Sequence, residues 1–96
     1  MNDIATGPLA SELAARLTQA LAPTHLAVSN DSAQHSGHMG DDGSGESHFS
    51  VEIESAAFAG LNRVSRQRLV NQALGHMLEG RIHALSLKTR APGENA

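Results

Sequence analysis

The fold of this chain is decided by the stretch Ser47-His48-Phe49-Ser50-Val51-Glu52-Ile53-Glu54, in which polar and apolar residues alternate without a break. In an extended chain the apolar residues of this stretch fall on one face and the polar residues fall on the other. The stretch therefore predicts a β-strand that is buried on one face only. Such a strand belongs to a sheet with a helical layer on one side, and the flanking residues supply that layer.

Two segments with helical periodicity flank this strand. The first predicts an amphipathic helix that ends before Pro23, because four leucines recur at every fourth position: Leu9, Leu13, Leu17 and Leu21. The second predicts a helix that begins near Ser65 and stops at Gly80, with this buried face: Leu69, Val70, Ala73, Leu74, Met77 and Leu78. Each helix can cover the apolar face of the sheet.

Two further strands are predicted, over residues 25–29 and 81–89. The resulting order is α-β-β-α-β, and the helix before the last strand allows a crossover to a parallel neighbour. We therefore expect a two-layer α+β domain, in which both helices lie on one face of a three-stranded mixed sheet. This domain should span residues 8–90, with flexible tails at 1–7 and 91–96.

The composition excludes several classes of protein. The chain has 96 residues and no cysteine, so it forms one modest domain without disulfides and offers no thiolate ligand. No apolar run approaches the roughly 18 residues that a membrane span needs. The start Met1-Asn2-Asp3-Ile4 lacks the pattern of a signal peptide. We therefore expect a cytoplasmic protein that does not enter a membrane.

Charge is distributed unevenly along the chain. Residues 1–56 carry one basic and eight acidic side chains, whereas residues 57–96 carry six basic and two acidic ones. The C-terminal part could dock an acidic partner or a phosphate backbone, although a solvated helix face explains the same charges. The candidate docking residues are Arg63, Arg66, Arg68, Lys88 and Arg90.

Histidines occur at two places that favour metal ligation. His83 stands at the head of an apolar strand pattern, and His35 and His38 lie in a glycine-rich loop upstream. Neutral imidazoles can serve as ligands of a metal centre whose other ligands come from elsewhere. The alternatives are a packed histidine at position 83, a solvated loop, and a chance zinc or nickel site at His35-x-x-His38.

The order and spacing of several short segments resemble the BolA-like protein family. These segments are Asn30-Asp31-Ser32 before the loop, Glu46-Ser47-His48-Phe49, Ser55-Ala56-Ala57-Phe58-Ala59-Gly60, Arg66-Gln67-Arg68-Leu69-Val70 and Ile82-His83-Ala84-Leu85. The resemblance runs from about Leu9 to Pro92 and implies a fold akin to the class II KH domain. The chain departs from the family at Gln67, where a histidine is usual, so no role of that histidine is transferred.

The resemblance also implies a partner and a cofactor. A monothiol glutaredoxin with glutathione would share a two-iron, two-sulfur cluster with this chain. His83 matches the invariant C-terminal histidine of the family, and His35 or His38 would be the second ligand. The free chain would then be a monomer, and the complex would be a heterodimer. Mixed cysteine and histidine ligation raises the potential of such a cluster and makes the histidine side sensitive to pH.

The residues do not favour an enzyme. The chain has no cysteine nucleophile, no Gly-x-Ser-x-Gly elbow and no phosphate-binding glycine loop. The alternative function is a nucleic-acid-binding transcriptional regulator, which the KH-like fold and the basic C-terminal part suggest. The Gly-x-x-Gly clamp of KH domains is not found between two helices, and only two aromatic residues, Phe49 and Phe58, could stack on bases.

Overall fold

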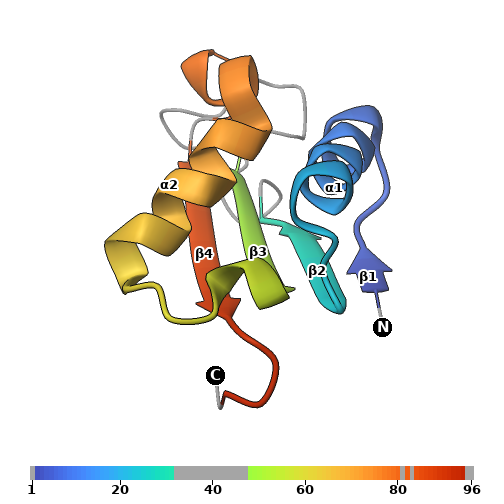
Figure 1. Cartoon of the computed structure of the whole chain (residues 1–96). Helices are drawn as coiled ribbons and strands as arrows, with labels where there is room; N and C mark the ends of the chain where they lie inside the picture. The colour runs from blue at the N-terminus through green and yellow to red at the C-terminus, as the bar shows by residue number, and fades with distance from the viewer. Residues whose placement is uncertain (1, 32–47, 81, 83, 95–96) are drawn as a thin grey trace.

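The computed structural model describes residues 2–31, 48–80, 82 and 84–94. These residues form a mixed four-stranded sheet, two α-helices and two 3-10 helices (Figure 1). The elements are β1 (Asn2–Ile4), α1 (Pro8–Leu21), β2 (His25–Asn30), β3 (His48–Glu54), η2 (Ala56–Phe58), α2 (Arg63–Leu74), η3 (Gly75–Glu79) and β4 (Ala84–Arg90).

The sheet has the strand order β1-β2-β3-β4. β2 and β3 are antiparallel, whereas β1 is parallel to β2 and β4 is parallel to β3. Both α-helices cover the same face of the sheet, as Figure 1 shows. The predicted two-layer α+β architecture with a mixed sheet is therefore confirmed.

The number of strands differs from the prediction, because β1 is a fourth strand inside the residues that we assigned to an N-terminal tail. Ile4 pairs with Val28 of β2, and the Ala5 N–H donates a hydrogen bond of 2.8 Å to the Val28 carbonyl. A strand of three residues is too short to show an alternating pattern of its own. Its pairing with β2 stabilises it, and the sequence alone does not reveal that pairing.

The core lies between the sheet and the helices. Phe49, Val51 and Ile53 of β3 are each at most 2% exposed, whereas the polar residues between them are half-buried on the other face. The leucine stripe of α1 is buried against them, and burial of each such side chain contributes about 1.5–3 kcal/mol. Both patterns were predicted from the sequence and are confirmed.

α2 is shorter than the predicted helix. It begins after Asn62, whose Oδ1 accepts a hydrogen bond of 2.8 Å from the Ser65 N–H. Gly75 has a φ of +55°, and this left-handed conformation ends the α-helix before η3 continues the chain. Val70, Leu74 and Met77 are nevertheless all buried, so the predicted apolar face is retained across the break.

Ser55 is the one described polar residue that is fully buried. Its hydroxyl donates a hydrogen bond of 2.6 Å to the Leu21 carbonyl at the end of α1. The same oxygen accepts a bond of 3.1 Å from the Ala57 N–H and so caps η2. This side chain ties the end of β3 to both the helical layer and the following turn.

Candidate functional site

One end of the sheet brings together the chain segments that flank the predicted ligands. The Asp31 N–H donates a hydrogen bond of 2.7 Å to the His48 carbonyl, and His48 is the register partner of Ala84 at the start of β4. Ile82 is 5% exposed, and its N–H donates a bond of 3.0 Å to the Met77 carbonyl. The end of β2 and the starts of β3 and β4 are therefore fixed beside one another.

The three predicted metal ligands, His83, His35 and His38, lie outside the described residues. Their described chain neighbours are Asp31 and His48 on either side of the 32–47 segment, and Ile82 and Ala84 on either side of His83. Among the residues that the structure describes, no group of three or more histidine, cysteine, aspartate or glutamate side chains could hold a metal ion. The chain also has no cysteine, so it offers no thiolate ligand of its own.

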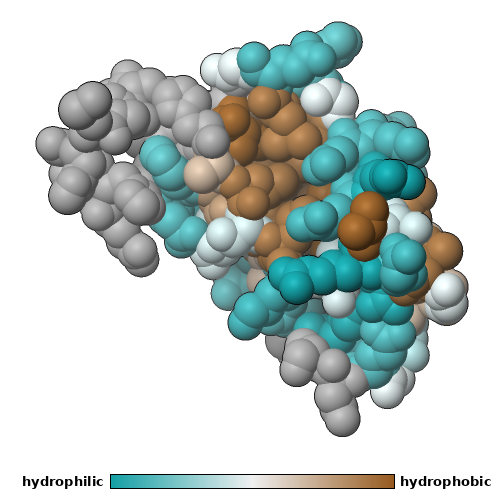
Figure 2. All heavy atoms as spheres, turned by 90° about the vertical axis from the view of Figure 1, so that its left-hand side faces the viewer, coloured by the Kyte–Doolittle hydropathy of each residue, from teal (hydrophilic) through white to brown (hydrophobic). Residues whose placement is uncertain are grey.

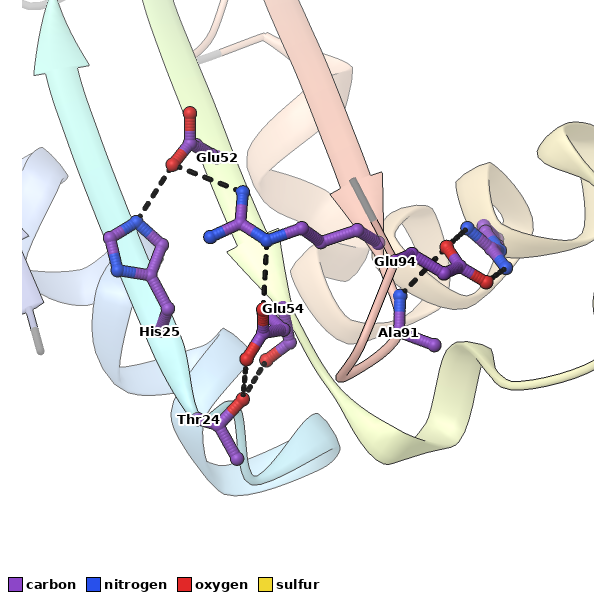
Figure 3. Close-up of polar contacts among 8 residues, drawn as sticks. Thr24, His25, Glu52, Glu54, Ala91 and Glu94 are labelled. Atoms are coloured by element: carbon purple, nitrogen blue, oxygen red, sulfur yellow. Dashed lines mark hydrogen bonds and ion pairs between the residues drawn. The ribbon is translucent and has the colours of Figure 1, made fainter. Parts of the chain in front are cut away.

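The opposite end of the sheet carries a network of charged side chains on the face away from the helices (Figure 3). Arg90 of β4 donates through Nε to Glu54 at 2.8 Å, and its terminal nitrogen lies 3.2 Å from Glu52. The Thr24 hydroxyl donates a bond of 2.6 Å to Glu54, and His25 Nε2 lies 2.9 Å from Glu52. The network therefore joins β2, β3 and β4.

The charges in this network favour ionised carboxylates. The hydrogen bond from Arg90 is the main cause that lowers the pKa of Glu52 below its ordinary value. The hydrogen bond from the Thr24 hydroxyl is the main cause for the lowered pKa of Glu54, and Arg90 adds to it. The same contacts raise the pKa of Arg90, so the three groups stabilise one another in their charged forms.

A second ion pair joins α2 to the C-terminal end of the described chain. Arg66 binds the Glu94 carboxylate through two parallel hydrogen bonds of 2.7 Å, one from each terminal nitrogen. Glu94 also accepts a bond of 3.0 Å from the Ala91 N–H. Arg66 lowers the pKa of Glu94 to about 2, and the Ala91 N–H contributes to this shift.

The five predicted docking cations therefore fall into two groups. Arg66 and Arg90 hold carboxylates of the same chain. For Arg63, Arg68 and Lys88, the described part of the chain provides no ion-pair partner. The sequence presented all five as equivalent basic residues, and only the fold distinguishes them.

Two of these unpaired cations line a groove between α2 and β4. The groove has a volume of about 460 Å³, and its wall includes Leu61, Arg63, Leu87 and Lys88. Figure 2 views the molecule from the side of α2 and β4, and it shows apolar side chains bordered by hydrophilic ones. Val64, in the first turn of α2, is 54% exposed. Among the described residues it is the large apolar residue with the greatest exposed fraction.

Sequence reasoning missed the partners in both ion-pair systems, namely Thr24, His25, Glu52, Glu54 and Glu94. The alternation of β3 placed Glu52 and Glu54 on the outer face, and this placement is confirmed. Their partners depend on the register between three strands, which no local pattern specifies. Another histidine, His76, is exposed, and its ion-pair partner among the described residues is Glu79 at 2.8 Å.

The fold defines a small two-layer α+β domain with a mixed sheet that is covered on one face. Comparison with protein families identifies the class further: the family described as BolA-like protein matches residues 17–94. This chain therefore belongs to the BolA-like protein family.

Individual relatives agree with this assignment. BolA-like protein 1 of Mus musculus is 37% identical over 90 residues, which cover 94% of this chain and 63% of the mouse protein. The solved structure of BolA1 from Arabidopsis thaliana is 38% identical, with a TM-score of 0.82 over 96% of this chain and 100% of that one. The BolA domain of SufE1 from Arabidopsis thaliana is 36% identical, with a TM-score of 0.83 over 95% of this chain and 100% of that one.

No α-helix in the described ranges combines the length and apolar character that crossing a membrane requires.

Proposed function

We propose that this chain is a non-enzymatic partner of a monothiol glutaredoxin and shares a two-iron, two-sulfur cluster with it. His83 and one of His35 and His38 are the ligands from this chain, and the glutaredoxin cysteine and a glutathione thiolate are the ligands on the other side. The role of the pair is assembly or transfer of the cluster, or regulation by iron. The chain is a monomer alone and forms a heterodimer with the glutaredoxin.

One observation carries this proposal: the two described residues that bound the 32–47 segment lie at the same end of the sheet as the residue that follows His83. Asp31, His48 and Ala84 are joined by one hydrogen bond and one strand pairing. The described residues on both sides of the 32–47 segment thus lie at the end of the sheet where Ala84, the residue after His83, begins β4. Family membership and the occurrence of a BolA domain in SufE1 support a role connected with iron–sulfur chemistry.

The absence of cysteine determines what the chain contributes. Iron–sulfur clusters are held mainly by thiolates, so a chain without cysteine cannot hold one alone. Imidazole ligands must be neutral to bind, so the histidine side should release the cluster as the pH falls toward the histidine pKa. A shared site of this kind suits a carrier or a sensor that responds to its partner.

The test is co-expression of the chain with a monothiol glutaredoxin, followed by visible absorption and circular dichroism of the purified complex. His83→Ala should change the spectrum and shorten the lifetime of the cluster. His76→Ala is the matched control, because His76 is exposed and its ion-pair partner in the described part of the chain is Glu79. Identical spectra for both variants would show that His83 is not a ligand.

The second ligand is tested in the same complex. His35→Ala and His38→Ala are made separately and together, and the proposal expects one single variant to reproduce the effect of the double variant. If the double variant retains the parental spectrum, the 32–47 segment supplies no ligand. The cluster would then bind this chain through His83 alone.

The nucleic-acid alternative is weaker, because Arg66 and Arg90 already hold carboxylates. Binding of nucleic acid depends mainly on cations that are available to phosphates. A duplex DNA titration at physiological salt tests this alternative, and a specific complex that Arg63→Gln and Arg68→Gln weaken would establish it.

A further inference from the structure

We infer that the groove between α2 and β4 is a docking site for an extended acidic peptide segment, which adds to the open edge of β4 as a further strand. This inference concerns the chain without any cluster and does not depend on the proposed ligands. It rests on three features of the described residues: an open strand edge, cations on both sides of that edge, and an apolar groove beside it.

The first feature is the edge itself. β4 is the last strand in the sheet order β1-β2-β3-β4, so one of its sides has no strand neighbour in the described structure. The Ser55 N–H donates a bond of 3.0 Å to the Arg90 carbonyl, so the backbone groups of Arg90 point toward β3. Because successive residues of a strand point in opposite directions, the backbone groups of Leu87 and Thr89 point to the open edge.

The second feature is the charge at this edge. Lys88 belongs to the outer face of the sheet, because it pairs in register with Glu52, whereas Arg63 comes from α2 in the helical layer. Both line the groove, and the described residues offer neither of them an ion-pair partner. Unpaired cations on both sides of an open edge are complementary to a strand whose side chains carry carboxylates.

The third feature is the groove. Its volume is about 460 Å³, and Leu61 and Leu87 form an apolar part of its wall. In an added strand, alternate side chains point to opposite faces of the sheet. An apolar side chain can therefore enter the groove while its neighbours stay outside. Two other lining residues, Arg66 and Arg90, hold Glu94 and Glu54 of the same chain, so Arg63 and Lys88 are the lining cations that the described residues leave for the peptide.

The probe is a short fluorescein-labelled peptide in which valine and glutamate alternate, and fluorescence anisotropy reports its binding to the full chain. The matched peptide carries glutamine in place of glutamate. We expect the acidic peptide to bind at least about tenfold more tightly than the glutamine peptide. Equal affinities for the two peptides would overturn the inference.

The groove variant combines Arg63→Gln with Lys88→Gln, and the control combines Arg16→Gln with Arg68→Gln, so both lose two positive charges. Arg16 pairs with Glu12 in α1, and neither Arg16 nor Arg68 lines the groove. The groove variant should bind the acidic peptide about tenfold more weakly, and the control should differ less than about twofold from the parent. An equal loss in both would mean that the peptide responds only to net charge and would refute the site.

Nuclear magnetic resonance of the labelled chain locates the peptide. The inference expects shifted amides at Leu87, Thr89 and the first turn of α2, together with slower hydrogen exchange at Leu87 and Thr89. Shifts confined to the outer face around Glu52 would overturn it. A single-stranded oligonucleotide is titrated in parallel, and binding of the oligonucleotide at these amides without binding of the peptide would assign the groove to nucleic acid instead.

Discussion

The charged network on β2, β3 and β4 and the groove beside β4 both contain arginine or lysine, but the surroundings of these cations differ. In the network, Arg90 contacts both Glu52 and Glu54, and its side chain is 17% exposed. In the groove, Arg63 and Lys88 have no carboxylate from the described chain. The comparison indicates that one set of cations stabilises the fold, whereas the other set is available for a partner.

The largest effect on stability is expected from Ser55→Ala, because Ser55 is fully buried at the end of β3, next to the charged network. The change removes the hydrogen bonds of 2.6 and 3.1 Å with the Leu21 carbonyl and the Ala57 N–H. Unsatisfied buried polar groups should lower the free energy of unfolding by about 2 kcal/mol. Urea denaturation measures this loss. Ser86→Ala, at an exposed position of β4, is the control, and equal losses in the two variants would contradict the role of Ser55.

A smaller loss is expected from Arg90→Gln. This change leaves Glu52 and Glu54 without their common cation, so the melting temperature should fall by several degrees. The double variant with Glu54→Gln should recover part of the loss, because it removes one of the two repelling carboxylates. A melting temperature equal to that of the parent would show that the network contributes nothing to folding.

Glu94→Gln should change the pH dependence of stability. Arg66 lowers the pKa of Glu94 from 4.5 to about 2, so the folded state favours the ionised carboxylate. The stabilisation is complete above about pH 4.5 and is lost as the pH falls toward 2. The melting temperatures of parent and variant should therefore differ near neutral pH and converge near pH 2. Glu79→Gln, at an exposed residue, is the control, and a constant difference would contradict the prediction.

The smallest effect on stability is expected from Arg63→Gln combined with Lys88→Gln. Neither side chain has an ion-pair partner in the described chain, so the melting temperature should change by no more than about 2 °C. The same variant is expected to lose affinity for the acidic peptide. A large fall in melting temperature would place these residues with Arg90, among the cations that stabilise the fold.

Local patterns in the sequence predicted most of the architecture. The alternation in β3 and the leucine stripe of α1 each specify a buried face, and the described residues confirm both. The N-terminal strand was missed, because three residues have no periodicity and depend on their pairing with β2. The early end of α2 at Gly75 was missed as well, since a single glycine inside a helical pattern is often tolerated.

The sequence predicted less of the site than of the fold. Arg66 and Glu94 are 28 residues apart in the chain, so no spacing rule connects them. Arg90 meets Glu52 and Glu54 only because β3 and β4 pair in a particular register. The predicted ligands His83, His35 and His38 lie outside the described residues and stay predictions. Composition identified the basic residues, but only tertiary contacts separate the paired cations from the unpaired ones.

The parallel pairing of β3 with β4 has a consequence for synthesis of the chain on the ribosome. β3 emerges before α2 and β4, and its side facing β4 stays open until the last strand has left the exit tunnel. During that interval Phe49, Val51 and Ile53 lack part of their final covering. A nascent chain stalled before Ala84 should therefore recruit chaperones and aggregate more readily than the released product.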